Sequence, residues 1–250
     1  MNKKEMDEYL KMRIGVDEPF KFHCTQCGEC CFNRNKEAIL ITAKDIFNIS
    51  KSQGLTPVEA VKNYGLAYIG SESRLPIVRL KTVGLLQQCV LLKDNKCSVH
   101  DSKPAVCAMF PIGRMLNLNP EEFDGRKHKI EYLYVNPECG DDTETHTARE
   151  WLYRFGISLE DTFFVEWSQM ISKLTPILQK AEKEFSEIMM KDLWDAIFSL
   201  LYLNYDIRQS FDSQFHSNSE KLMELMQIFS QHWSGKGHGG VTSISDKKAI

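Results

Sequence analysis

Four of the eight cysteines of this chain lie within eight residues, in the run FHCTQCGECCF. Cys24, Cys27 and Cys30 follow one another with two residues between each, and Cys31 follows Cys30 directly. Thiols that lie one short loop apart can surround one ion with little extra loss of chain entropy. This spacing is typical of zinc and iron–sulfur sites. The run therefore predicts a metal site around which the rest of the chain must fold.

The adjacent pair Cys30 and Cys31 sharpens this prediction. Neighbouring Cα atoms are only about 3.8 Å apart, so we expect the two side chains to have difficulty reaching one tetrahedral ion together. One of the pair is expected to serve a different ion or a bridge. The pair also disfavours a simple bacterial ferredoxin, in which the fourth cysteine follows three residues on and precedes a proline.

The remaining cysteines lie further along the chain. Cys89, Cys97 and Cys107 lie in QCVLLKDNKCSVHDSKPAVCAMFP, and Cys139 lies in NPECG. Eight thiolates are enough for two four-sulfur centres or for one larger thiolate-bridged cluster. We expect the first cysteine run and these three later cysteines to form one connected site, which Cys139 joins.

Two histidines stand beside the cysteines. His100 follows Cys97 by three residues, a spacing at which it could bind zinc. With eight thiols available, we expect His100 to orient a ligand rather than to be one, and His23 is a weaker candidate. The apolar residues 109–111 are expected to shield the centre from water.

Disulfides are the alternative use of eight cysteines, and they need an oxidising compartment. Residues 1–20 carry charges throughout and contain no apolar stretch typical of a secretory signal, so we expect a cytoplasmic protein whose thiols bind metal. No apolar run approaches the ~18 residues of a membrane span. The formal net charge is −3. We therefore expect neither a membrane span nor a nucleic-acid partner.

Together these residues resemble the bacterial CxxCxxCC cysteine-cluster family, typified by the YkgJ group, whose domain is described as zinc- or iron-chelating. The resemblance covers roughly residues 20 to 140 and implies that all eight cysteines match the family's cysteine positions. It departs from the family where Arg-Pro and Cys-Arg are replaced by Lys103-Pro104 and Cys107-Ala108. The motifs that carry the resemblance are Cys24-x-x-Cys27-Gly28-x-Cys30-Cys31, Cys97-Ser98-Val99-His100, Pro104 with Cys107, Phe110-Pro111 and, more loosely, Cys139-Gly140.

The same domain occurs in flagellin lysine N-methylases, so the resemblance admits a methyl-transfer enzyme. The sequence contains no Walker A pattern and no H-E-x-x-H. Its one G-x-G-x-x-G match, residues 235–240, lies in the polar, glycine-rich tail and does not follow a predicted strand, so any catalysis must be carried by the metal centre. The sequence leaves open whether the centre is zinc, iron or an iron–sulfur cluster. One interpretation is a metal-binding protein with redox or transfer chemistry. The alternative is a non-catalytic zinc scaffold, a metal-handling protein or a protein-interaction module.

The expected fold class is α+β. An irregular, cysteine-rich, metal-centred part with short strands and helices is predicted over residues 20–140. A helical C-terminal region over residues 145–233 follows, which could bind a protein partner. Residues 234–250 are polar and glycine-rich, and we expect them to be disordered.

Local patterns predict individual elements. Thr42 is expected to cap a helix that Gly54 stops, and Thr56 to open a second helix with a capping box. Strands are predicted over 75–81, 88–92 and 129–135. In the C-terminal region, helices are expected to begin at Thr145, Ser158, Thr175-Pro176 and Ser219.

Overall fold

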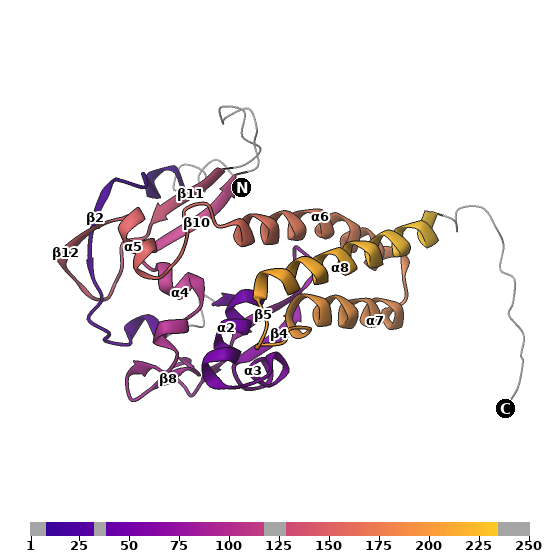
Figure 1. The fold of residues 1–250 in the computed structure, drawn as a ribbon, viewed down its shortest axis with the longest axis horizontal. Coiled ribbons are helices and arrows are strands. Elements are labelled where there is room, and N and C mark those ends of the chain that lie inside the picture. Colours follow the sequence, from indigo (N-terminus) through magenta and orange to yellow (C-terminus); the bar gives the residue numbers. More distant parts are fainter. Residues whose placement is uncertain (1–8, 33–38, 118–128, 235–250) are drawn as a thin grey trace, which may run out of the picture.

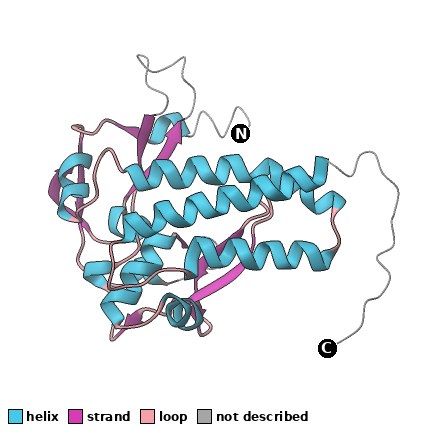
Figure 2. Ribbon diagram, turned by 45° about the vertical axis from the view of Figure 1, so that its right-hand side comes forward, coloured by secondary structure: helices cyan, strands magenta, loops and turns pink. Residues whose placement is uncertain are grey.

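The computed structural model describes residues 9–32, 39–117 and 129–234. In this part of the chain, short strands and helices form one end of the molecule, and three long helices extend from it side by side (Figure 1, Figure 2). The predicted α+β class is confirmed. Of the predicted tail, residues 235–250 lie outside the described residues.

The described strands are short and pair antiparallel in small sheets. The sheet orders are β1-β11-β10, β12-β2, β3-β5-β4, β6-β7 and β8-β9. The strands are β1 (Arg13–Ile14), β2 (Pro19–His23), β3 (Leu40–Ile41), β4 (Gly65–Ile69), β5 (Pro76–Leu80), β6 (Thr82–Val83), β7 (Gln88–Cys89), β8 (Leu92–Lys93), β9 (Lys96–Cys97), β10 (Ile112–Asn117), β11 (Lys129–Tyr134) and β12 (Asp141–Thr147).

The three longest of the described helices, α6, α7 and α8, lie in the C-terminal region. The α-helices are α2 (Ala43–Gln53), α3 (Pro57–Tyr64), α4 (Ala105–Met109), α5 (Ala148–Arg154), α6 (Thr162–Glu184), α7 (Glu187–Phe198) and α8 (Phe211–Ser234). Single helical turns are η1 (Glu29–Cys31), η2 (His100–Ser102) and the π-helical η4 (Ser199–Leu203).

Local sequence signals fix the first two of these α-helices. Thr42 and Asp45 form the capping box of α2, and Gly54 ends the helix with a left-handed φ of 64°. Thr56 and Glu59 form the same box at α3. Both predicted helices are confirmed.

The predicted strands are confirmed for β5 and β11, whereas residues 88–92 divide between two hairpins. β7 pairs with β6, and β8 pairs with β9. The backbone N–H of Val90 donates to the carbonyl of Lys81, while Leu91 accepts from Ser98. The chain therefore changes partner between these two residues.

The predicted helix starts in the C-terminal region were wrong. Thr145 lies within β12, and the α5 cap is Thr147. The α6 cap is Asp161, whose carboxylate accepts from the backbone N–H of Phe164, rather than Ser158. Pro176 lies inside α6, because buried neighbours such as Leu174 hold that helix against the core across the proline.

The predicted last helix was also too short. It begins at Phe211 rather than at Ser219. Phe211 and Phe215 are buried, so packing against the core favours helix over this additional segment.

The larger apolar core joins the cysteine-rich part to the helical region. Ile46 of α2 and Val78 of β5 pack in the same buried cluster as Leu174 of α6, Ile197 of α7 and Leu222 of α8. Each of these side chains is at most 1% exposed. The three long helices thus complete a core that the N-terminal part begins.

A second buried cluster lies under β2, α4 and α5. Phe20 and Phe22 of β2 pack with Met109 of α4 and with Trp151 and Leu152 of α5. This cluster fixes the chain that enters the first cysteine run and the chain that leaves Cys107. Among the described residues, we find no helix with the length and apolar character needed to span a membrane.

Candidate metal centre

The first cysteine run forms a loop that ends in a single 3-10 turn. β2 leads into Cys24 and Cys27, and Cys30 and Cys31 lie in η1. Gly28 precedes this turn with φ 80°, and its carbonyl accepts from the N–H of Cys31 at 2.8 Å. A Cβ at Gly28 would lie 3.4 Å from the carbonyl oxygen of Asn95 in the β8–β9 hairpin, an ordinary contact distance, so it is the positive φ of the turn that favours glycine here.

The later cysteines arrive on separate elements. Cys89 lies on β7 opposite Thr82, and Cys97 lies on β9 opposite Leu92. Cys107 lies in α4, and Cys139 lies on the bend before β12. All eight cysteines lie in the described part of the chain, and none of them forms a disulfide there.

Cys139 lies beside the start of the first run. Its thiol lies near those of Cys27, Cys24 and Cys30, which contribute to raising its pKa. Burial, chiefly, raises the pKa of Cys139 to about 11. The pKa of Cys27 is lowered, because the backbone N–H groups of Glu29 and Gly140 and the hydroxyl of Thr25 donate to its sulfur. Cys24, Cys27, Cys30 and Cys139 therefore form one thiol group, which we call group one.

A second group surrounds Cys31. Its sulfur lies 4.0 Å from that of Cys30, and the neighbouring thiols of Cys30 and Cys89, together with burial, raise its pKa. Burial likewise raises the pKa of Cys97, to which the nearby thiols of Cys89 and Cys30 also contribute. Group two is therefore Cys30, Cys31, Cys89 and Cys97, and it shares Cys30 with group one.

The adjacent pair is less restrictive than its sequence suggests. The sulfurs of Cys30 and Cys31 lie 4.0 Å apart. Two sulfurs on one tetrahedral zinc ion, at about 2.3 Å each, are separated by about 3.8 Å. Adjacency in the chain therefore does not prevent both thiolates from binding one ion.

Cys107 is positioned through the two ends of α4. The backbone N–H of Ala105 donates to Oδ1 of Asp45 at 2.8 Å, and the indole N–H of Trp151 donates to the carbonyl of Met109 at 3.0 Å. Asp45 and Trp151 are both buried. Each end of this short helix is thus tied to a different helix of the fold, with the half-buried Cys107 between them.

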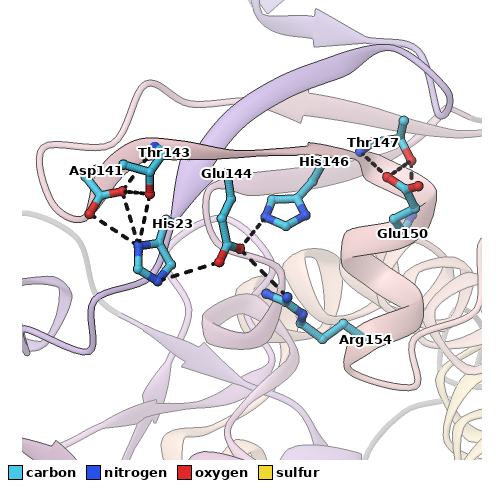
Figure 3. A network of polar contacts seen from close by, with 8 residues as sticks. All are labelled: His23, Asp141, Thr143, Glu144, His146, Thr147, Glu150 and Arg154. Atoms are coloured by element: carbon cyan, nitrogen blue, oxygen red, sulfur yellow. Dashed lines mark hydrogen bonds and ion pairs between the residues drawn. The ribbon is translucent and has the colours of Figure 1, made fainter.

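A polar network joins β2 to β12 beside group one (Figure 3). Nδ1 of His23 lies 3.2 Å from both carboxylate oxygens of Asp141. Glu144 lies between two imidazoles, at 3.7 Å from Nε2 of His23 and 3.1 Å from Nε2 of His146, and Arg154 is 3.8 Å away. The network holds together the strands that lead into Cys24 and out of Cys139.

The histidine expectations can now be placed. His23 belongs to the network between β2 and β12, whereas His100 pairs with Asp101 at 3.5 Å. Sequence reasoning missed Glu144 and His146. Their spacing of two residues, which puts both on one face of a strand, was the available signal.

Charge near the sulfurs includes one cation. Lys103 lowers the pKa of Cys97, against the larger effect of burial, and its ammonium lies 4.4 Å from the ring centre of Phe155. The guanidinium of Arg114 instead pairs with Asp161 at 2.8 Å, and its central carbon lies 4.0 Å from the ring centre of Phe164. A lysine thus provides positive charge beside group two.

The donor set suits a soft metal ion. Thiolates bind zinc and iron strongly, and here they come from separate elements that converge. Because the pKa of Cys31 and of Cys139 is raised, these thiols must lose their protons before they can bind an ion. Within residues 9–32, 39–117 and 129–234, no three His, Cys, Asp or Glu side chains already have the arrangement of a metal site.

Comparison with protein families agrees with the motif. Residues 23–140 match the CxxCxxCC family model, described as a "putative zinc- or iron-chelating domain". The search of curated proteins and the search of solved structures gave no match. The resemblance seen in the cysteine pattern is thereby confirmed.

Proposed function

We propose that the chain binds zinc or iron through its clustered cysteines, with residues 20–140 as the metal-binding domain and residues 145–233 as its helical support. The observation that carries the proposal is the meeting of thiols from the first run with Cys89, Cys97 and Cys139. Free thiols that merely pack have no reason to converge in this way. Cys107, held between Asp45 and Trp151, is the eighth proposed ligand.

The shared position of Cys30 gives the proposal a sharp test. Metal content is measured after anaerobic purification for the wild type, Cys30→Ser and Cys24→Ser. Cys30→Ser is expected to lose more metal, because Cys30 lies near thiols of both groups whereas Cys24 belongs only to group one. A metal content that is unchanged in both variants would contradict the proposal.

The chemistry of the centre defines the first form of this function. An iron–sulfur cluster would carry electrons, or could support transfer chemistry, and its thiolate-to-iron charge transfer would colour the protein. Iron with inorganic sulfide and visible absorption would support this form.

A structural zinc centre is the second form, and the two cysteine hairpins favour it. β6–β7 and β8–β9 have strands of only two residues, and isolated hairpins of this size are not stable. A closed thiolate site would contribute the folding energy that they lack. A colourless protein with stoichiometric zinc, whose hairpins become protease-sensitive on chelation, would support this form.

The proposed setting is the cytoplasm, where thiols stay reduced. A protein partner is proposed for the helical region, where Ile188, Met223 and Ile228 are exposed. Localisation of a tagged chain and chemical crosslinking from α7 and α8 test these two statements. Secretion with oxidised cysteines, or the absence of any crosslinked partner in cells, would contradict them.

A further inference from the structure

The N-terminus of α2 contains a buried carboxylate with two distinct sets of partners. Oδ2 of Asp45 accepts from the backbone N–H of Thr42 at 2.8 Å and from its hydroxyl at 2.7 Å. Oδ1 accepts from the backbone N–H of Ala105 at 2.8 Å, sixty residues along the chain. Asp45 is 5% exposed. One oxygen therefore completes a helix cap, and the other reaches a distant segment.

The helix α3 shows what an ordinary capping box looks like in the same protein. Oε2 of Glu59 accepts from the backbone N–H and from the hydroxyl of Thr56, each at 2.8 Å. Glu59 lies at the surface, where water can solvate its carboxylate. The cap itself does not require burial, so burial of Asp45 indicates a second role.

That second role concerns the helix on which Cys107 lies. α4 has only five residues, and a helix of this length is not stable without outside contacts. Ala105, two residues before Cys107, donates the first N–H of the helix, and its partner is Asp45. Such an N–H has no partner within a helix, so a buried acceptor at this position determines where the helix begins.

We propose that Asp45 is a positioning residue that holds α4 in place and so fixes the Cys107 thiol at the metal centre. The inference rests on the proposed function for the role of Cys107, but the hydrogen bond that holds α4 does not depend on it. Asparagine at position 45 would keep the shape of the side chain. It offers one acceptor oxygen where two are needed, and its amide group would face an N–H donor.

The test compares Asp45→Asn with Thr42→Val and Glu59→Gln in the full chain. Thr42→Val weakens the α2 cap but leaves the bond from Ala105 to Asp45, and Glu59→Gln weakens the matched cap of α3. With zinc bound, alkylation of each cysteine by iodoacetamide is followed by mass spectrometry. Amide hydrogen exchange at residues 105–107 is measured in the metal-free chain.

Asp45→Asn is expected to accelerate labelling of Cys107 by about ten-fold, the effect of one lost buried hydrogen bond on local opening, with little change at Cys24 and Cys27. Exchange at residues 105–107 should accelerate as well, while Thr42→Val and Glu59→Gln leave both readouts near wild type. Unchanged exchange in Asp45→Asn, or an equal increase at every cysteine, would overturn the inference.

Failure of the proposed function gives a different result. If zinc protects no cysteine of the wild type, metal binding is refuted, and with it the metal role of Asp45. Faster exchange at residues 105–107 would then show a bond that only stabilises α4. The two readouts therefore separate the positioning of the helix from the binding of the metal.

Discussion

Gly140, next to Cys139, is a position at which one methyl group should disturb both the fold and the site. Its φ is 75°, and a Cβ there would lie 2.4 Å from the carbonyl oxygen of His23 and 2.7 Å from Cε2 of Phe22. The oxygen belongs to the backbone of β2, so it cannot rotate away. Gly140→Ala therefore requires β2 and β12 to separate where Asp141 pairs with His23.

Gly156 is the matched control. It has a φ of 64°, and nothing lies within 4 Å of a Cβ built on it. Gly156→Ala should cost about 1–2 kcal/mol, the usual penalty of the left-handed conformation. Gly140→Ala carries the same penalty and about 1–3 kcal/mol more, typical of an added methyl group in a packed region.

The assay is urea unfolding followed by circular dichroism, with and without metal. A difference of about 2 kcal/mol in the free energy of unfolding between the two variants would appear in thermal unfolding as a difference of about 4–8 °C in Tm for a chain of this size. Gly140→Ala is also expected to weaken metal binding, because the N–H of Gly140 donates to Cys27. Equal losses of stability and unchanged metal affinity in both variants would refute this reasoning.

Three further results are expected. In the metal-free chain near pH 8, iodoacetamide should label Cys27 before Cys139, because Cys27 is exposed and its pKa is lowered, whereas Cys139 is half-buried and its pKa is about 11. Faster labelling of Cys139 would contradict the arrangement of group one. Trp151→Phe removes the indole donor to the carbonyl of Met109, so the free energy of unfolding in urea should fall by about 1–2 kcal/mol and alkylation of Cys107 should become faster. The control Trp167→Phe in α6 should leave that alkylation unchanged. The pKa of Glu59 and of Glu150 is lowered by donors from their capping threonines, so these carboxylates stabilise the fold above their unfolded pKa, near 4.5, and lose that effect as pH falls through the lower folded pKa. Replacing both with Gln should flatten the decline of stability below pH 4.5, and an unchanged slope of Tm against pH would count against this assignment.

Local signals in the sequence were sufficient for several elements. The capping boxes at Thr42 and Thr56 depend on residues within a few positions of one another. Such interactions are readable without knowledge of the fold. The cysteine spacing likewise predicted the domain, because close ligands need only a short loop.

Long-range pairing was not readable in the same way. β2 pairs with β12 through residues such as His23 and Asp141, which are 118 positions apart. Phe20 and Phe22 alternate with polar residues in β2, but β12 has the sequence DDTETHT and contains no apolar residue that would mark it as a strand. Pro176 predicted a helix start, yet packing of α6 against the core outweighs the local cost of proline. Distant contacts decided these elements.

The same distinction applies to the site. Spacing identified the cysteines, but it could not reveal that Cys30 lies near thiols of both groups or that Asp45 and Trp151 hold the ends of α4. The expected difficulty of the adjacent pair came from Cα distances alone. Side-chain rotamers bring those sulfurs to 4.0 Å, close to the spacing on one ion.

The central claim is that these thiols bind a metal ion. X-ray absorption at the metal edge of the full chain, purified without oxygen, tests it most directly together with total metal content. The account predicts bound zinc or iron with sulfur neighbours at about 2.3 Å. A chain that purifies without metal and fails to take up zinc or iron, or one whose ion has only nitrogen and oxygen neighbours, would contradict it.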